Sequence, residues 1–229
     1  MNEFENTFQQ SEVKTLNSYI NDTFKWLMLG IVVTFVTAFA FEKSNVGVAV
    51  FSNSFMLIAM PVIELGIAVY FGVRLFKLKP FTAKILFLFY SFLTGMTFSA
   101  IFAFYTTMTV SMAFLLSALF FGVLVLFGTY TKIDLTKIGH ICFIGLFVYI
   151  IYAILATIFG WGQFLLPFIS LALFTGITAY DMQQTINFYY QFQNDAEMIK
   201  RLSIFSAFNL YLDFINIFLD ILRILGDSD

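Results

Sequence analysis

Seven long apolar stretches limit what this sequence can fold into. They run approximately over residues 24–41, 55–76, 84–104, 110–127, 141–159, 164–181 and 202–225. A helix needs roughly 20 predominantly apolar residues to cross a bilayer, and each stretch meets or approaches that length. Backbone groups cannot stay unpaired in hydrocarbon, so a stretch that spans must be helical. The sequence lacks the short alternating strands of an outer-membrane barrel, and it therefore predicts an all-α integral membrane protein.

Composition supports this prediction. Hydrophobic residues make up 60% of the chain and charged residues only 11%, whereas a soluble domain carries about 25% charged residues. Too few polar side chains are available to cover a water-facing globule, so lipid must contact much of the surface. The net charge of −2 gives no basic surface for nucleic acid. Cys142, the single cysteine, excludes an internal disulfide and a cysteine metal cluster.

The chain is expected to form one membrane domain over residues 24–226. A polar tail precedes it at residues 1–23, and a short tail follows at residues 227–229. The first 25 residues are polar and do not form a cleavable signal peptide. The first membrane helix is therefore expected to direct insertion.

Basic residues predict the orientation of the spans, because Lys and Arg concentrate on the cytoplasmic side. Ten of the twelve lie in or beside the leading tail and the second, fourth and sixth connections, and two, Lys43 and Arg223, lie on the other side. This distribution places the N-terminus in the cytoplasm. Seven full spans would place the C-terminus outside, whereas a re-entrant last segment would return it to the cytoplasm.

Four carboxylates interrupt the apolar stretches: Glu64, Asp181, Asp213 and Asp220. An ionisable residue within a membrane segment costs several kcal/mol and is a functional candidate by default. Arg74 and Arg223 lie nearer the ends of their segments, where long side chains can reach the headgroups.

The last segment carries a polar stripe. Successive members are three or four residues apart and therefore share one helix face; they are Ser206, Asn209, Asp213, Asn216, Asp220 and Arg223. The preceding segment repeats the pattern with Thr175, Thr178, Asp181 and Gln184. Such a face must contact other helices or a water-filled path, so the last helix is a candidate central element. Small residues spaced by four, Gly95 with Ser99 and Ala103 or Ala118 with Gly122, would let helices approach closely.

Oxygen ligands of this kind suit two functions. Carboxylates and amide carbonyls bind hard cations such as Ca²⁺, and two carboxylates close together in a low dielectric do not both ionise at low cost. The same residues could therefore bind cations and respond to protons. The alternative is that the polar groups form interhelical hydrogen bonds that fix packing, with Asp220 paired to Arg223 or reaching the interface.

The stretch from Asn209 to Gly226, NLYLDFINIFLDILRILG, closely resembles the last-helix signature of the Bax inhibitor-1 family, and the stretch from Ala179 to Gln183, AYDMQ, resembles the matching part of its sixth helix. The resemblance implies six helices wrapped around a central C-terminal helix. It also implies a pH-sensitive Ca²⁺ leak in which Asp181 and Asp213 form the aspartate pair that closes the pore and contacts the ion. Glu64 matches an acidic residue of the second helix in bacterial members, and Arg74 is the candidate for their basic latch. Asn209, Asn216 and Asp220 join Glu64 as candidates along the ion path.

Other functions remain open. The chain could be a non-transporting regulator that binds a membrane partner, such as a quality-control protease or a cell-death component, and coupled antiport would use the same titratable cation site. Two aspartates in consecutive helices also resemble an intramembrane aspartyl protease, but Leu210, Tyr211 and Leu212 replace the Gly-x-Gly that should precede Asp213. No motif of another enzyme class occurs, so we expect no enzyme activity and no cofactor. The expected partners are lipid, Ca²⁺ and protons, and the expected location is a bacterial plasma membrane.

Overall fold

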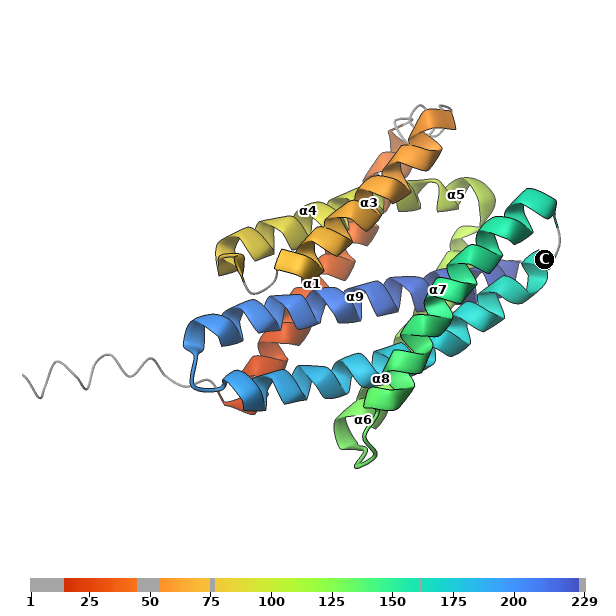
Figure 1. The fold of residues 1–229 in the computed structure, drawn as a ribbon. Helices are drawn as coiled ribbons and strands as arrows, with labels where there is room; N and C mark the ends of the chain where they lie inside the picture. Colours follow the sequence, from red (N-terminus) through yellow and green to blue (C-terminus); the bar gives the residue numbers. More distant parts are fainter. Residues whose placement is uncertain (1–14, 45–53, 75–76, 161, 227–229) are drawn as a thin grey trace, which may run out of the picture. The chain divides into compact units, whose positions relative to one another are not determined.

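A computed structural model describes residues 15–44, 54–74, 77–160 and 162–226. The chain is all-α, and no strand occurs in these ranges. The helices, coloured in chain order in Figure 1, are α1 (Leu16–Lys43), α3 (Ser54–Arg74), α4 (Pro80–Ser99), α5 (Ile101–Phe104), α6 (Thr107–Tyr130), α7 (Thr136–Phe159), the 3₁₀-helix η2 (Gln163–Leu165), α8 (Leu166–Phe192) and α9 (Ala196–Gly226).

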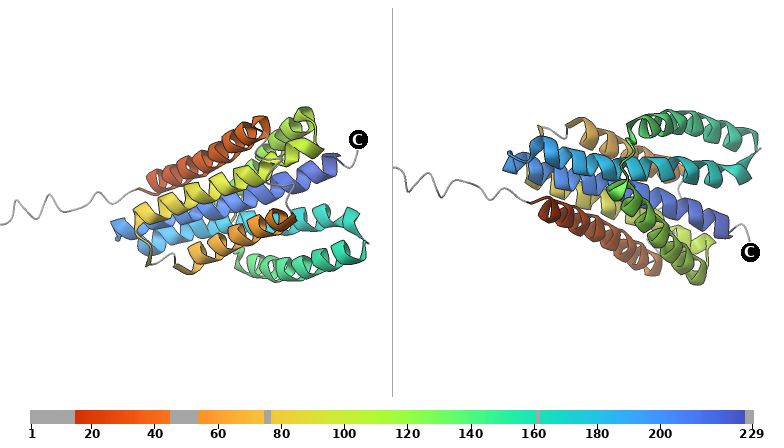
Figure 2. Two further views of the ribbon diagram at one scale, coloured as in Figure 1. Left: turned by 90° about the horizontal axis from the view of Figure 1, so that it is seen from above. Right: turned by 90° about the horizontal axis from the view of Figure 1, so that it is seen from below.

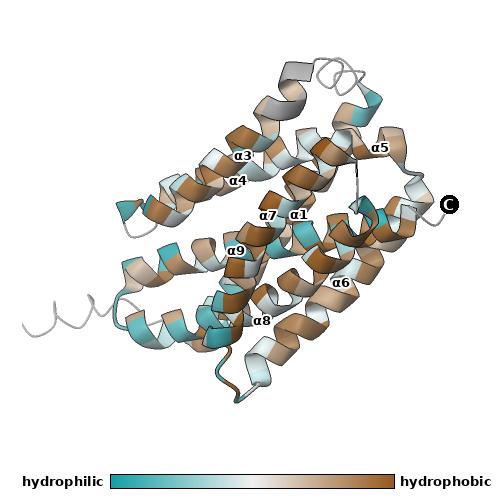
Figure 3. Ribbon diagram, turned by 45° about the vertical axis from the view of Figure 1, so that its right-hand side comes forward, coloured by the Kyte–Doolittle hydropathy of each residue, from teal (hydrophilic) through white to brown (hydrophobic). Residues whose placement is uncertain are grey.

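Six helical stretches are long and apolar enough to cross a membrane, judged on the described residues. They comprise α1, α4 with α5, α6, α7, η2 with α8, and α9, which correspond to six of the seven predicted segments. The other predicted segment coincides with α3, a helix of 21 residues with Pro61 inside it. Figure 3 shows hydrophobic residues along most of α6 and α7 and hydrophilic residues at the joined ends of α8 and α9. The prediction of an all-α membrane protein is confirmed.

The chain divides into two compact units. The first contains the chain up to Ala100 together with Thr185–Phe208, and the second contains Ile101–Gln184 together with the chain from Asn209 onwards. Helices α8 and α9 run side by side (Figure 2), and each contributes one part to each unit. The sequence predicts a single membrane domain and gives no sign of this division.

In the first unit, α1 packs closely against α4. The Thr34 hydroxyl donates a hydrogen bond to the Ser91 carbonyl at 3.0 Å. Gly95 faces the backbone of Thr34 and the side chain of Thr37, where a Cβ atom would not fit. The predicted close approach at Gly95 is therefore confirmed. Phe208 of α9 also packs in this unit, against three rings from two other helices: Phe71 of α3, and Phe87 and Tyr90 of α4.

In the second unit, two glycines bring neighbouring helices against the part of α8 that carries Asp181. Gly128 of α6 lies against the carbonyl of Ala179, and Gly139 of α7 lies against the ring of Tyr180. Gly122, which the sequence predicts as a close-packing residue, faces open space instead. The spacing of small residues does not reveal which face of α6 meets a neighbour, because that depends on the rotation of the helix in the fold.

The last helix is the most buried of the candidate spans. In α9, 72% of the apolar window is buried, against 6–39% in the other five. Its aromatic residues pack within each unit; for example, Phe214 lies between Phe114 and Phe121 of α6 in the second unit. This burial agrees with the expectation that the last helix is a central element.

Two predicted boundaries are wrong. Helix α1 begins at Leu16 rather than Phe24, because Thr15 caps it by accepting a hydrogen bond from the Ser18 amide. Its first turns pack against α8 and α9 through a cluster centred on Tyr19, Tyr189, Ile199 and Leu202. Residues 16–23, which the sequence places in a polar tail, are thus helical and partly buried.

The connection between the last two helices is also shorter than predicted. The predicted segments 164–181 and 202–225 leave a long connection between them, but α8 continues to Phe192 and α9 begins at Ala196. Asp195 starts α9 by accepting a hydrogen bond from the Met198 amide at 2.8 Å. Apolarity does not predict these ends, because a helix with polar faces can continue beyond the hydrophobic stretch when its other face packs.

Candidate functional site

Asp181 and Asp213 come together in the second unit, from two neighbouring helices. Asp181 lies in α8 and is 9% exposed; Asp213 lies in α9 and is 3% exposed. The charge of Asp181 acts directly on Asp213. The structure therefore brings together the two residues that the sequence proposes as a pair.

The surroundings of Asp213 offer few donors. The Thr178 side chain, one helical turn before Asp181, faces the Asp213 carboxyl group, while its hydroxyl also donates a hydrogen bond to the Phe174 carbonyl at 2.7 Å. The Oδ2 atom of Asp213 is buried and has no hydrogen-bond partner among the described residues. Leaving a buried carboxyl oxygen without a partner costs about 1–3 kcal/mol or more. This oxygen is therefore suited to bind a proton or a cation, or to accept a hydrogen bond from water.

Gln183, two residues after Asp181, holds the connection between α6 and α7. Its Oε1 accepts a hydrogen bond from the Leu135 amide at 2.9 Å, and its Nε2 donates to the Ile133 carbonyl at 2.8 Å. In the same connection, Oδ1 of Asp134 accepts a hydrogen bond from the Thr136 amide, at the first residue of α7, at 2.9 Å. The AYDMQ segment therefore both carries an acid and anchors the neighbouring loop. The second role was not foreseen from the sequence, although Gln183 belongs to the quoted motif.

Replacing Gln183 with alanine is expected to loosen this loop. Both hydrogen bonds to the loop backbone would be lost, and each contributes roughly 1 kcal/mol. Amide exchange at Leu135 should accelerate about tenfold, measured by hydrogen–deuterium exchange in detergent micelles. Gln191→Ala, at an exposed position of α8, is the matched control and should leave the loop unchanged. An unchanged exchange rate at Leu135 in Gln183→Ala would show that the hydrogen bonds of Gln183 do not hold the loop.

Glu64 lies in the first unit, where its Oε1 accepts a hydrogen bond from the Thr97 hydroxyl of α4 at 2.6 Å. The Thr97 hydroxyl also contacts the Leu93 carbonyl at 3.3 Å. Glu64 is half-buried, so this hydrogen bond gives one oxygen of a carboxyl group within the membrane segment a donor. Sequence reasoning identified the acid but not its partner, because threonines are frequent in these helices and no spacing indicates which one is opposite.

Removing the Thr97 hydroxyl is expected to destabilise the protein more than neutralising the acid. Thr97→Val keeps the shape of the side chain but leaves a half-buried carboxyl group without its donor, at a cost of about 1–3 kcal/mol. Glu64→Gln keeps an acceptor for Thr97 and should cost less. Thermal unfolding in detergent micelles compares the two variants. If Thr97→Val unfolds at the same temperature as the wild type, the hydrogen bond between Thr97 and Glu64 does not stabilise the protein.

Asp220 and Arg223 lie near the C-terminal end of α9. Asp220 is buried, and its Oδ1 lies 4.0 Å from Nη1 of Arg223, which confirms the alternative that these residues pair. The side chain of Ser170 also faces Asp220. The other oxygen of Asp220, Oδ2, is buried without a hydrogen-bond partner among the described residues.

The remaining candidates take different positions. Asn209 and Asn216 are half-buried on α9, and the Asn216 amide donates to the Leu212 carbonyl of its own helix at 2.7 Å. Arg74 is exposed in the last turn of α3 and forms no ion pair with another described residue. Its proposed role as a latch stays a prediction.

A preformed metal cage is not present in the part of the chain that the structure describes. No group of three or more His, Cys, Asp or Glu side chains there could hold a metal ion. A Ca²⁺ ion takes six to eight oxygen ligands when it is bound firmly. Asp181 and Asp213 with Thr178 could contribute only part of such a shell, and water would have to supply the rest.

Comparisons with known proteins agree with the motifs. The family model described as "Inhibitor of apoptosis-promoting Bax1" matches residues 16–229. The chain belongs to the Bax inhibitor-1 family. It is similar to the inner membrane protein YbhL of Escherichia coli K12, at 34% identity over 93% of this chain and 92% of YbhL. It is equally similar, at 34% identity over 96% of both chains, to an uncharacterized protein of Borreliella burgdorferi.

Membership of the Bax inhibitor-1 family covers almost the whole described structure. The matched range includes every helix from α1 to α9. The chain is therefore a multi-pass membrane protein of this family, and Asp181 and Asp213 lie within the part that the family shares.

Proposed function

We propose that this protein is a passive, pH-sensitive Ca²⁺ leak gated by Asp181 and Asp213. The observation that carries the proposal is the meeting of two buried carboxyl groups from α8 and α9. A buried carboxylate would be costly if it served packing alone, because an amide of the same shape fills the space without a charge. Membership of the Bax inhibitor-1 family supports the same assignment.

The gate works through the number of protons on the pair. Two carboxylates at this proximity repel each other when both are ionised, so the pair responds to pH as a unit. At neutral pH, an ionised Asp181 pairs with a cationic group and shares a proton or hydrogen bonds with Asp213. Acid protonates the pair and weakens these contacts. Helix α9, which carries Asp213, can then move.

In this proposal Ca²⁺ is transported through the protein and is not bound firmly. No third His, Cys, Asp or Glu side chain joins the pair in a metal-binding group among the described residues, and conduction requires binding that is weak enough to let the ion leave. Asn209 and Asn216, which are half-buried, continue the polar face of α9 together with Asp220, and their side-chain oxygens provide further contacts. Coupled antiport would use the same residues.

The proposed location is a bacterial inner membrane with the N-terminus in the cytoplasm. The similarity to YbhL, which is an inner membrane protein, supports the location. The distribution of Lys and Arg supports the orientation. Lipid surrounds the protein, and a protein partner is not needed for the leak.

Ca²⁺ flux into dye-loaded proteoliposomes tests the proposal. Purified protein should admit Ca²⁺ faster at about pH 5.5 than at about pH 8, because acid opens the gate. Protein-free liposomes of the same lipid control for bilayer leakage. Absence of flux at every pH, with circular dichroism showing folded helices, would contradict the leak. A partner that co-purifies in stoichiometric amount would then favour the non-transporting regulator.

A further inference from the structure

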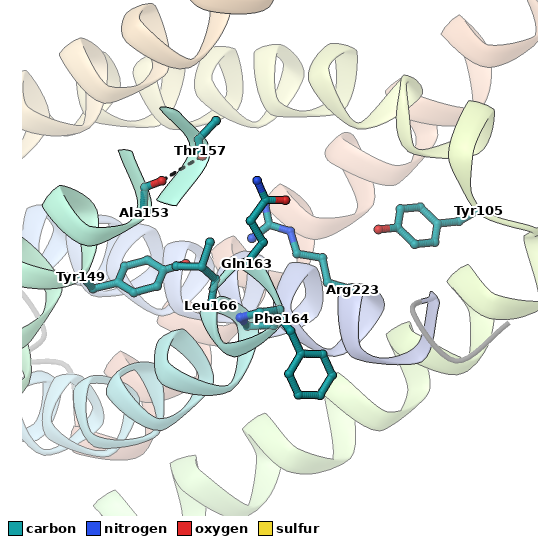
Figure 4. A pocket seen from close by; sticks show the side chains of 9 residues that line it. Tyr105, Tyr149, Ala153, Thr157, Gln163, Phe164, Leu166 and Arg223 are labelled. Atoms are coloured by element: carbon teal, nitrogen blue, oxygen red, sulfur yellow. Dashed lines mark hydrogen bonds between the residues drawn. The ribbon is translucent and has the colours of Figure 1, made fainter. Parts of the chain in front are cut away.

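The second unit contains a cavity of about 640 Å³ at the end of α7, η2 and α9. Its lining, shown in Figure 4, combines polar and apolar side chains, with Arg223, Gln163, Tyr105 and Tyr149 as the main polar residues. The hydroxyl ends of Tyr105 and Tyr149 point from opposite sides towards the region where Arg223 and Gln163 end. This volume lies within the range of about 300–1,000 Å³ typical of small-molecule sites.

The polar lining favours an anion. Arg223 is the only charged side chain among the described lining residues, and none of those residues carries a carboxylate. The guanidinium is 49% exposed and lies 4.0 Å from Asp220, which is longer than a hydrogen bond. The ion pair with Asp220 therefore leaves part of the guanidinium accessible, and two phenol hydroxyls and an amide add further donors. Arginine with neighbouring hydroxyls matches the geometry of a phosphate group.

The surroundings of the cavity favour a lipid over a free anion. Phe164 lines the cavity and is 67% exposed. Ile158 and Phe159, in the last turn of α7, are also largely exposed. A phosphate at Arg223 would thus adjoin an apolar surface that can contact acyl chains.

Arg223 is also unusual in the predicted topology. It is one of only two basic residues on the non-cytoplasmic side, where Lys and Arg are depleted in membrane proteins. General attraction to headgroups would not require the donor-rich cavity around it. A specific ligand accounts for both the position of the arginine and the shape of its surroundings.

We propose that this cavity binds the phosphate of an anionic glycerophospholipid through Arg223, with Gln163, Tyr105 and Tyr149 as further hydrogen-bond donors. The acyl chains lie along the exposed residues of η2 and the end of α7. An anionic headgroup is preferred over phosphatidylcholine because the charged side chain among the described lining residues is an arginine, and none of those residues carries a carboxylate to pair with the choline ammonium. This site is separate from the aspartate pair and does not depend on the proposed leak.

Native mass spectrometry of the full-length protein, released from detergent with defined lipids, tests the site. The wild type should retain phosphatidylglycerol in preference to phosphatidylcholine. Arg223→Gln should reduce phosphatidylglycerol retention by roughly tenfold, since it removes the charge from the main contact. Lys137→Gln is the matched control: it removes one positive charge from an exposed position at the other end of α7 and should leave retention unchanged.

A second variant protects the test against a folding defect. Tyr105→Phe combined with Tyr149→Phe keeps both rings, including the contact between Tyr105 and Gly226, and removes only the hydroxyls. It should weaken phosphatidylglycerol retention several-fold. Equal retention of the two lipids by the wild type, or no loss in either variant, would overturn the proposal. Displacement of the lipid by an equal concentration of inorganic phosphate would overturn its assignment to a lipid.

Discussion

The Asp181→Asn/Asp213→Asn double variant is expected to leak Ca²⁺ at neutral pH as fast as either single variant, with almost no further response to acid. The two carboxyl groups act on each other from α8 and α9, so removing either one disables the pair. A hydrogen bond to a charged group contributes about 1.5–3 kcal/mol, and its loss should raise the open population about tenfold or more.

Ca²⁺ flux is measured across a pH series in proteoliposomes for the wild type, the two single variants and the double variant. These four proteins form a double-mutant cycle. Residues that act as a unit give non-additive effects, so the second substitution should add little to the first. Additive effects would indicate two independent groups instead of one gate. Unchanged flux and an unchanged pH response in both single variants would contradict the proposed mechanism.

Asp134→Asn is the control for this cycle. Asp134 lies outside the membrane segments, in the connection before α7, and hydrogen bonds from the hydroxyl and amide of Thr136 hold its pKa below the usual range. It is therefore ionised throughout the assay, from about pH 8 to about pH 5.5. Replacing it removes one carboxylate from the same unit without altering a group that titrates in this range, and the pH response should stay as in the wild type.

Replacing Gly128 with leucine is expected to destabilise the protein and to disturb the site together with it. A Cβ atom at this position of α6 would collide with the carbonyl of Ala179 and the Cβ of Met182 in α8. Neither atom lies at the end of a flexible side chain, so α6 and α8 would have to separate. Overpacking of this kind costs typically 1–3 kcal/mol, and here it displaces the turn that carries Asp181.

Gly122→Leu in the same helix separates this steric effect from the general effect of replacing a glycine. A Cβ atom at Gly122 meets no other atom within 4 Å, so the variant should unfold within about 0.5 kcal/mol of the wild type. Thermal unfolding in detergent micelles compares the two substitutions. Equal stability of Gly128→Leu and Gly122→Leu would show that the contact between α6 and α8 is not tight.

Hydropathy and periodicity predicted the membrane segments and the polar face of the last helix. Each property depends on residues close together in the chain: about 20 apolar residues define a span, and steps of three and four place Asp213, Asn216 and Asp220 on one face. The motif around Asp213 also led to the family before the comparisons confirmed it. These conclusions required no knowledge of how the helices pack.

The positions of helix ends outside the apolar stretches depend on side-chain caps and on packing, and not on hydropathy. Leu16 begins α1 and Phe192 ends α8, both beyond the predicted segments, because side-chain caps and contacts between helices stabilise turns that hydropathy does not detect. Tyr19 shows this directly: its ring packs on Tyr189 and its hydroxyl hydrogen-bonds with Ser206 at 3.2 Å. Such partners are far apart in the chain.

The sequence therefore predicted the approximate place of the membrane helices and the acids that they carry, and six of its seven segments match candidate spans among the described residues. The packing of helices within each unit brings Asp181 to Asp213, Glu64 to Thr97 and Gln183 to the loop before α7, and the sequence does not predict the last two contacts. The physical reason is that a partner across two helices depends on the rotation and offset of both. Those are set by close contacts such as Gly128 against Ala179, which no pattern along a single helix records.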